Sequence, residues 1–455
     1  MHTASPVSLR VIIIGGGAAG ASAAARARRL DPNAEITLVE ASAMITHAPC
    51  GIPYAISSLV PSHKMLRTYS PERFASERRV QVLTNTVAED VDVDNRTVDV
   101  RRDGGQERLR WDALVLATGA KPIVPRLEGL GELRPITLRH PEDVTEARAR
   151  LERAKRVAVI GGGYIGVEMA EALLEMGKST ILFEMMDRLM PGALDSEISK
   201  VLEDAMRSAG VEVHLLEAVR ALSRRGEMIV LQTDLGSYNV DEIVMGVGVR
   251  PNVDLALRAG ARLGVTGAVE TDESMSTNVE GVFAAGDLVE KHHLVLGRKV
   301  WIPLAPAANK EGQVAGANAV RRGSLRMRGV VGTAVTRFRD VYVARTGLGE
   351  AEANRHGFKV ESTLIRARTK AGYFPGGVEV TVKMIVERGS GRILGVQVIG
   401  ADPIIASYVD VAALAIERGM TVEDLFFSDI GYMPATAPVW HPLIVAARTL
   451  SGGRF

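Results

Sequence analysis

Residues 11–20, Val-Ile-Ile-Ile-Gly-Gly-Gly-Ala-Ala-Gly, decide the fold of this 455-residue chain. The first four are β-branched and apolar, which is typical of a strand buried on both faces of a sheet. The glycines that follow have the spacing G-x-G-x-x-G, and an alanine- and arginine-rich helix is predicted from there to about Leu30. The next predicted strand, 36–40, ends in Glu40, an acid twenty residues after Gly20. Together these features predict a dinucleotide-binding fold, whose loop admits a pyrophosphate and whose acid accepts hydrogen bonds from a ribose.

The same pattern occurs a second time in the middle of the chain. A predicted strand at 156–160 is followed by Gly161-Gly162-Gly163-Tyr164-Ile165-Gly166, a predicted helix and a strand that ends in Glu184. Two complete nucleotide folds predict two bound nucleotides. Because a carboxylate favours a free ribose 2′-hydroxyl over a 2′-phosphate, Glu184 predicts NADH, and Arg188 nearby leaves NADPH open.

Length, charge and cysteine content exclude several classes of protein. The chain is too long for one core, so three domains are expected, and a net charge of +1 argues against nucleic acid as a partner. No apolar run reaches the length of a membrane span, which predicts no membrane partner. A single cysteine argues against a secreted disulfide scaffold and favours a cytoplasmic location. Few Asn and Gln residues with many charges favour a thermophilic source.

The remaining patterns complete the domain organisation. Short strands are expected over 86–112 with a turn at Asp103-Gly104-Gly105, a buried strand over 111–119, a helix over 141–154 and another strand over 277–287. From about residue 328, alternating strands precede helices and no nucleotide motif occurs. We predict an α/β chain with two Rossmann-like dinucleotide-binding domains and a C-terminal α+β domain whose aromatic and Pro-rich end suits an interface. The expected boundaries are 1–120 for the first part of the first nucleotide-binding domain, 121–152 for a linker and a helix returning to it, 153–270 for the second nucleotide-binding domain, 271–327 for the second part of the first domain and 328–455 for the C-terminal domain.

Cys50, the only cysteine, lies in the stretch Thr-His-Ala-Pro-Cys-Gly-Ile-Pro-Tyr at 46–54. Pro53 suits the first turn of a short helix, and the positive end of that helix would favour thiolate over thiol. Within its own chain Cys50 has no partner for a disulfide. Its redox chemistry would therefore proceed through a mixed disulfide, a persulfide or a sulfenic acid. The alternative is a small buried core residue.

Basic residues near the first glycine loop are candidates for substrate binding. Ser22, Arg26 and Arg29 have the spacing that places them on one face of the first helix, and Lys64 and Arg67 add positive charge nearby in the sequence. The two readings are a solvated helix face and a site for a phosphate-rich substrate that lies across the face towards Cys50.

The motifs resemble one known family. They are the two glycine fingerprints, Ala117-Thr118-Gly119, Val247-Gly248-Val249-Arg250-Pro251-Asn252, Ala285-Gly286-Asp287 and His47-Ala48-Pro49-Cys50-Gly51-Ile52-Pro53-Tyr54. The chain resembles the pyridine-nucleotide-disulfide oxidoreductases over nearly its whole length. More narrowly it resembles their single-cysteine branch, with coenzyme A disulfide reductases, archaeal NAD(P)H sulfur oxidoreductases and NADH oxidases. The resemblance implies FAD in the first fold (1–120 and 271–327), NADH or NADPH in the second (153–270), a C-terminal dimerisation domain (328–455), and a homodimer with an active site shared across subunits.

The resemblance also implies roles for individual residues. Cys50 would be the redox thiol, Tyr164 an aromatic gate over the flavin, and Tyr373 and Tyr432 tyrosines that reach the cysteine of the partner subunit. Ser22, Arg26, Arg29 and Thr46 match substrate-contacting positions. The expected cofactor-binding residues are Gly15, Gly17, Ala18, Ala19, Gly20, Glu40, Val87, Ala117, Thr118, Gly119, Arg139, Gly161, Gly163, Tyr164, Ile165, Gly166, Glu184, Gly248, Gly286, Asp287 and Ala305. No metal site is expected.

These motifs and the resemblance predict an enzyme, with three possible functions for the chain. The first is reduction of coenzyme A disulfide, coenzyme A persulfide or polysulfide by NAD(P)H through FAD and Cys50. The alternative is an NADH oxidase that reduces O₂ to water or peroxide. The third is a redox-responsive flavoprotein that acts as a binding module. The resemblance does not favour a peroxidase. The single-cysteine peroxidases carry a histidine at the position of Ala18, so this chain lacks their usual acid–base partner.

Overall fold

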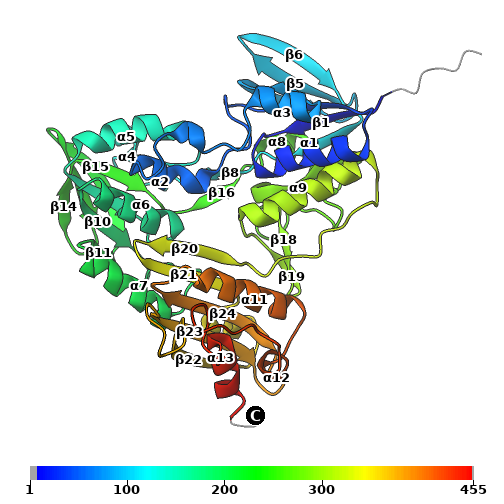
Figure 1. Ribbon diagram of the computed structural model, residues 1–455. Helices are drawn as coiled ribbons and strands as arrows, with labels where there is room; N and C mark the ends of the chain where they lie inside the picture. Colours follow the sequence, from blue (N-terminus) through cyan, green and yellow to red (C-terminus); the bar gives the residue numbers. More distant parts are fainter. Residues whose placement is uncertain (1–7, 453–455) are drawn as a thin grey trace, which may run out of the picture.

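Three main sheets organise the chain, which a computed structural model describes over residues 8–452. In Figure 1 the first parallel sheet lies at the upper right, the second parallel sheet at the left, and an antiparallel sheet with its helices at the bottom. The predicted fold class is confirmed: α/β, with two Rossmann-like sheets and a C-terminal α+β domain. We call these parts the first lobe, the second lobe and the interface lobe.

The first lobe is built on a five-stranded parallel sheet with the order β17-β7-β1-β2-β3. Its strands are β1 (Arg10–Ile14), β2 (Glu35–Val39), β3 (Gln81–Leu83), β7 (Ala113–Leu116) and β17 (Val282–Ala284). Side chains along β1 pack alternately into two hydrophobic cores, one on each face of the sheet, because successive side chains point to opposite faces of a strand. Ile13 packs towards the helices α1 (Ala18–Leu30) and α9 (Ala305–Val320), whereas Ile12 and Ile14 pack with Trp111 on the other face.

Helices α1 and α9 approach each other so closely that their backbones touch. A Cβ atom added at Gly312 would lie 2.1 Å from the carbonyl oxygen of Ala19, and one added at Gly316 would lie 2.1 Å from that of Ala23. Glycine on α9 and alanine on α1 are therefore required where the helices cross. The N-terminus of α9 is thus fixed relative to the glycine loop from which α1 begins.

The other face of the first sheet carries the predicted strands of 86–112. They form an antiparallel sheet of β4 (Thr86–Asp92), β5 (Thr97–Arg102) and β6 (Gly105–Arg110), and the β5–β6 turn falls at Asp103 and Gly104 as expected. The lobe also contains α3 (Pro71–Arg78), α8 (Asp254–Arg258), β18 (Lys291–His293) and β19 (Arg298–Val300), whereas the short helix α2 (Ile52–Ile56) packs against α5 (Asp143–Arg153) and α6 (Tyr164–Glu175) of the second lobe.

The second lobe repeats this plan with a four-stranded parallel sheet in the order β11-β10-β9-β15. Its strands are β9 (Arg156–Ile160), β10 (Ser179–Glu184), β11 (Glu212–Leu215) and β15 (Glu242–Met245), with helices α6 (Tyr164–Glu175) and α7 (Ser196–Ser208). A second, antiparallel sheet is formed by β12 (Val219–Arg225), β13 (Met228–Thr233) and β14 (Ser237–Val240), with α4 (Leu130–Leu133) beside β12. The chain passes between the lobes along the paired strands β8 (Ala120–Pro122) and β16 (Val249–Pro251).

The position of helix α5 (Asp143–Arg153) differs from the expectation that 121–152 returns to the first sheet. Val144 and Leu151 pack in one core with Val157 and Val159 of β9, and Arg150 pairs with Glu242 of β15 at 2.8 Å. The helix is amphipathic, and its buried stripe matches the apolar face of the second lobe. Its sequence shows that a face is buried but not which sheet covers it.

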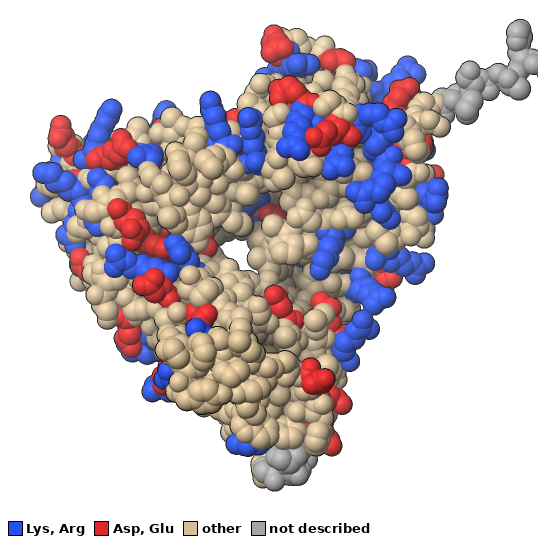
Figure 2. Space-filling view, in the orientation of Figure 1, with Lys and Arg blue, Asp and Glu red and all other residues tan. Residues whose placement is uncertain are grey.

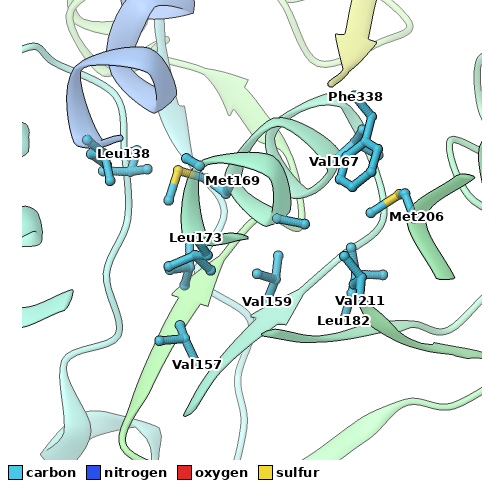
Figure 3. Packing of buried hydrophobic residues seen from close by; sticks show 14 of the residues in the cluster. Leu138, Val157, Val159, Val167, Met169, Leu173, Leu182, Met206, Val211 and Phe338 are labelled. Atoms are coloured by element: carbon cyan, nitrogen blue, oxygen red, sulfur yellow. The ribbon is translucent and has the colours of Figure 1, made fainter. Parts of the chain in front are cut away.

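The interface lobe contains an antiparallel sheet in the order β20-β21-β24-β23-β22. Its elements are β20 (Ala334–Phe338), β21 (Val341–Gly347), β22 (Val360–Arg368), β23 (Glu379–Glu387), β24 (Ile393–Gly400), α10 (Glu350–Arg355), α11 (Ile405–Glu417), α12 (Val422–Phe426) and α13 (Pro442–Leu450). Figure 3 shows Phe338, at the end of β20, beside Val167 of α6 and near Met206 of α7. The interface lobe therefore shares a hydrophobic core with the second lobe.

Candidate functional site

The two glycine loops have the same local geometry. Gly15 and Gly161 both adopt φ +103°, which favours glycine. A Cβ atom at Gly15 would lie 2.2 Å from the carbonyl oxygen of Ala117, and one at Gly161 would lie 2.6 Å from that of Gly246. In both loops the first glycine therefore allows a tight turn against the neighbouring strand.

The acids after the second strand of each lobe reach back to these loops. Glu40 accepts a hydrogen bond from the amide of Gly16 at 2.7 Å, and Glu184 accepts one from the amide of Gly162 at 2.8 Å. Both carboxylates are buried, and their second oxygen accepts a further amide hydrogen bond, from Ser42 and Met186 respectively. Each acid thus lies beside its loop, where a ribose would follow the pyrophosphate.

The loops also have room for that pyrophosphate. A Cβ atom at Gly163 would meet no atom within 4 Å, and one at Gly17 would approach only the ring of His47, at 3.8 Å. The backbone amides at the starts of α1 and α6 have no acidic side chain in the first helical turn. Open glycines at helix N-termini suit an anionic ligand, so the residues present fit two dinucleotides.

Asp287 and Arg139 meet at the edge of the first sheet, at 2.7 Å between Nη2 and Oδ2. The backbone carbonyl of Asp287 accepts a hydrogen bond from the indole of Trp301 at 2.8 Å. A Cβ atom at Gly119 would lie 3.4 Å from the guanidinium of Arg139. The structure thus brings together three of the positions expected to contact the flavin.

A buried ion pair that sequence reasoning missed holds the peptide before Asp287. Lys291 and Glu311 lie 3.4 Å apart with side chains that are 1% exposed. Glu311 accepts a hydrogen bond from the amide of Gly286 at 2.9 Å, and Lys291 donates a hydrogen bond to the carbonyl oxygen of Gly286 at 2.8 Å. Burial raises the pKa of Glu311, and Lys291 acts against this. Nothing in the sequence pairs a lysine with a glutamate twenty residues later.

Cys50 lies in a 3-10 turn, Pro49–Gly51, that leads directly into α2. The residue is solvent-exposed, and it is the one free cysteine of the chain. Burial of the thiol by surrounding atoms raises its pKa, the charge of Glu168 raises it further, and Arg139 lowers it. The expectation that a helix terminus lowers this pKa is therefore wrong for the chain by itself, because α2 is only one turn long and acids lie near the thiol.

His47 supplies no cation to Cys50. Its ring packs edge-to-face on that of His140 at 4.4 Å between centroids, and burial together with His140 lowers the pKa of His47 to about 4. The histidine is therefore neutral at physiological pH.

A polar cluster beside Cys50 connects α2, α6 and β20. Thr336 of β20 donates to the carboxylate of Glu168 at 2.7 Å. Arg337 pairs with Glu171 at 3.0 Å and stacks over the ring of Tyr54, with 5.4 Å from its Cζ atom to the ring centroid. Sequence reasoning missed these contacts. The available signal was Glu168, Glu171 and Glu175 on α6, at spacings that place acids on neighbouring helical turns.

The residues expected to bind substrate lie on α1 and on the segment before α3. The hydroxyl of Ser22 donates to the side-chain oxygen of Asn309 on α9 at 2.8 Å. Arg29 and Lys64 are exposed, and Arg26 and Arg67 are partly buried. The hydroxyl of Thr46 is engaged with the backbone of Tyr69 in both directions, at 2.9 and 3.2 Å. In Figure 2, Lys and Arg side chains gather along the outer edge of the first lobe.

The remaining expected residues lie on the surface of the interface lobe, at helix N-termini, and in loops or strands near the nucleotide folds. Tyr373 and Tyr432 share a hydrogen bond of 3.0 Å between their hydroxyls and remain exposed on the interface lobe. Tyr164 is the first residue of α6, Ile165 follows it, and Ala305 is the first residue of α9. Thr118 donates to the carbonyl of Asn252 at 2.8 Å, Gly248 has φ +104°, and Val87 pairs with Arg101 in the β4–β5 ladder.

Within residues 8–452 no helix is both long and apolar enough to cross a membrane, and no group of three or more metal-ligating side chains occurs. Figure 2 shows a hollow where the three lobes meet. Two dinucleotide folds in one chain, with a single exposed thiol under the influence of Glu168, Asp287 and Arg139, define a two-nucleotide redox enzyme.

The chain belongs to the pyridine nucleotide-disulphide oxidoreductases. Residues 9–312 match this family, and residues 333–443 match its dimerisation domain. As a member, the chain is an oxidoreductase that uses FAD and NAD(P)H, and its C-terminal domain is of the kind that forms homodimers.

Several characterised relatives align along nearly the full chain. An NAD(P)H coenzyme A polysulfide/persulfide reductase from Pyrococcus horikoshii is 42% identical over 97% of this chain and 98% of its own. An NADH oxidase from Methanocaldococcus jannaschii is 33% identical over 96% of this chain and 98% of its own. The structure of an NAD-dependent persulfide reductase from A. fulgidus superposes with a TM-score of 0.94 and 36% identity, over 98% of this chain and 84% of that one.

Proposed function

We propose that the chain uses NADH to reduce sulfur–sulfur bonds in coenzyme A persulfide, coenzyme A disulfide or polysulfide, with Cys50 as its redox thiol. The observation that carries the proposal is the position of this single, exposed cysteine, whose pKa responds to Arg139 and Asp287 of the first nucleotide fold. Bound FAD would relay electron pairs from NADH to sulfur. A thiol at that place suits attack on a sulfur–sulfur bond, which a thiolate cleaves by forming a mixed disulfide or a persulfide. The names of the archaeal relatives support the same substrate class.

The residues of this chain have distinct tasks in the proposal. Gly15, Gly17, Gly20 and Glu40 bind the nucleotide half of FAD, and Asp287, held by Arg139, binds its ribitol. Arg26 and Arg29 on α1 bind coenzyme A phosphates, and Lys64 and Arg67 add positive charge. We keep the domain boundaries of the sequence prediction, except for helix α5, and a cytoplasmic location, as parts of this proposal.

The proposed nucleotide is NADH. Glu184 is buried beside the second loop, where it would accept hydrogen bonds from a ribose. Arg188, four residues after Glu184, donates to Asp187 at 2.9 Å and to the carbonyl of Leu194 at 3.2 Å, so its guanidinium is engaged. A 2′-phosphate would therefore meet a carboxylate without a free cation from Arg188.

The proposed active site is completed by a second subunit. The hydroxyls of Tyr373 and Tyr432 face each other at 3.0 Å, and the two side chains are 77% and 46% exposed. A pair of phenols held together on the surface of an interface lobe would donate hydrogen bonds to a departing thiolate of the other subunit.

Anaerobic turnover of NADH with coenzyme A disulfide and with polysulfide tests the proposal. We expect Cys50→Ser to abolish turnover with both acceptors and to leave reduction of the flavin by NADH intact, which serves as the internal control. Turnover that survives in Cys50→Ser contradicts the proposal.

The NADH oxidase is the second candidate, favoured by relatives of that name. Little anaerobic turnover in the unmodified protein, with rapid NADH consumption on admission of air, would decide for it. A flavoprotein that stays reduced with every acceptor would instead be a binding module.

A further inference from the structure

The interface lobe contributes to the redox site of its own chain as well as to dimer formation. Strand β20 runs along α6, and three consecutive contacts connect them: Thr336 with Glu168, Arg337 with Glu171, and Arg339 with Glu175. The contacts differ in burial. The carboxylate of Glu171 is 6% exposed, whereas Arg339 and Glu175 are about half exposed at 3.4 Å.

Arg337 is the member of this series that also reaches the cysteine side of the site. Its guanidinium lies over the ring of Tyr54, four residues after Cys50 and on the helix α2 that follows the thiol. Burial raises the pKa of the Tyr54 hydroxyl, Glu168 raises it further, and Arg337 acts against both. One side chain therefore interacts with α2 and with α6 at once.

Helix α6 carries the residue expected to lie on the nicotinamide side of the flavin. Tyr164 is its first residue, and Glu171 lies two turns further along. Ile52 and Ile56 on α2 share a hydrophobic core with Val167 and Ala170 on α6. Packing of this kind leaves the helices free to slide slightly, whereas a planar guanidinium fixed by a carboxylate and an aromatic ring sets one relative position.

We propose that Arg337 is a positioning residue that fixes the Cys50 helix α2 against the gate helix α6. It would keep the thiol and the nicotinamide-side residues in register with the flavin between them. The inference rests on the proposed role of Cys50.

The test compares Arg337→Met with the matched control Arg339→Met in the full-length holoenzyme. Three rates are measured: reduction of the flavin by NADH, its reoxidation by polysulfide, and alkylation of Cys50 by iodoacetamide at a pH where the thiol is fully ionised. We expect Arg337→Met to slow both half-reactions at least about threefold and to raise the limiting alkylation rate at least about threefold, because α2 is released. Arg339→Met should change none of them, since its ion pair is exposed to solvent.

A double variant separates positioning from charge neutralisation. If Arg337 only neutralises Glu171, Arg337→Met combined with Glu171→Gln should restore all three rates, which would overturn the proposal. A defect confined to reduction by NADH, or equal behaviour of the two single variants, would overturn it as well. If Arg337→Met does not fold, Arg337→Lys carries the test. It keeps the charge and loses the planar stack, so a wild-type alkylation rate in that variant would be the contradicting result.

Failure of this inference can be distinguished from failure of the proposed function. Alkylation of Cys50 is measured without turnover, so it reports on the position of α2 even if Cys50→Ser retains activity.

Discussion

Replacement of Gly312 by alanine tests the backbone contact between α1 and α9. The new methyl carbon would lie 2.1 Å from the carbonyl oxygen of Ala19, which is more than 1 Å closer than a carbon and an oxygen normally approach. Overpacking of a core costs about 1–3 kcal/mol, and the upper part of this range, about 2–3 kcal/mol, applies here because the clash is with the backbone of Ala19. The better helix propensity of alanine returns about 1 kcal/mol. We expect a net loss of about 1–2 kcal/mol and a lower affinity for FAD, because both helix N-termini would move.

The measurements are thermal unfolding and FAD retention. A loss of that size lowers the Tm of the first transition by about 2–8 °C in a domain of ordinary size. The matched control is Gly131→Ala in α4, where an added Cβ atom would meet nothing within 4 Å. If Gly312→Ala retains FAD and unfolds like this control, the argument from close packing is refuted.

Three further predictions concern the site and the contact between lobes. The pKa of the Cys50 thiol is raised in the FAD-free chain, so less thiolate is present at neutral pH than in a free thiol. The rate of Cys50 alkylation should therefore still rise with pH above 9. An alkylation rate that reaches its plateau near pH 7 would contradict this prediction. Arg26→Ala combined with Arg29→Ala should raise KM for coenzyme A disulfide and leave KM for polysulfide unchanged, and an equal loss on both acceptors would refute the assignment of the phosphates. Lys383 is 3% exposed and lies 2.9 Å from Glu350 in a cluster with Asp195 and Glu197. Its replacement by Met is expected to cost about 1–3 kcal/mol, because Asp195, which is 9% exposed, loses its cation while the other two acids keep contact with solvent. The hydrogen bond from Lys383 lowers the pKa of Glu350, so this stabilisation is present above the ordinary glutamate pKa and is lost as pH falls through the lower value; chemical denaturation of Lys383→Met should show a smaller loss of stability on acidification than the unmodified protein.

The sequence predicted the parts of the fold that local rules control. Glycine spacing and strand-end acids gave both nucleotide folds, because the turn at Gly15 and the reach of Glu40 depend on residues close in sequence or on the fixed geometry of a strand–helix–strand unit. The turn at Asp103 follows from turn chemistry in the same way. The strand expected over 277–287 is confirmed only for β17, Val282–Ala284, and the segment ends in a 3-10 turn at Gly286–Leu288.

The parts it could not predict depend on contacts between distant segments. The pKa of Cys50 is raised by burial and by Glu168, more than a hundred residues later, so a rule about helix termini gave the wrong direction. Arg337 reaches Tyr54 across a gap in sequence more than twice as long. The sheet against which α5 packs depends on which one offers it an apolar face. The expected roles of Tyr373 and Tyr432 require a second subunit and stay predictions.

The strand order of the first sheet has a consequence for biosynthesis. Strand β7 lies between β1 and β17, and residues 117–281 separate β7 from its second neighbour in the chain. At translation rates of about 5–20 residues per second, an apolar strand edge stays unpaired on the nascent chain for roughly ten to thirty seconds. The second lobe, which is nearly continuous in sequence, can fold on the ribosome during that interval. Because the proposed FAD site includes Asp287 and Ala305, the first residue of α9, the flavin would be loaded only after this late segment has emerged, and the waiting edge of β7 is where a chaperone would be needed.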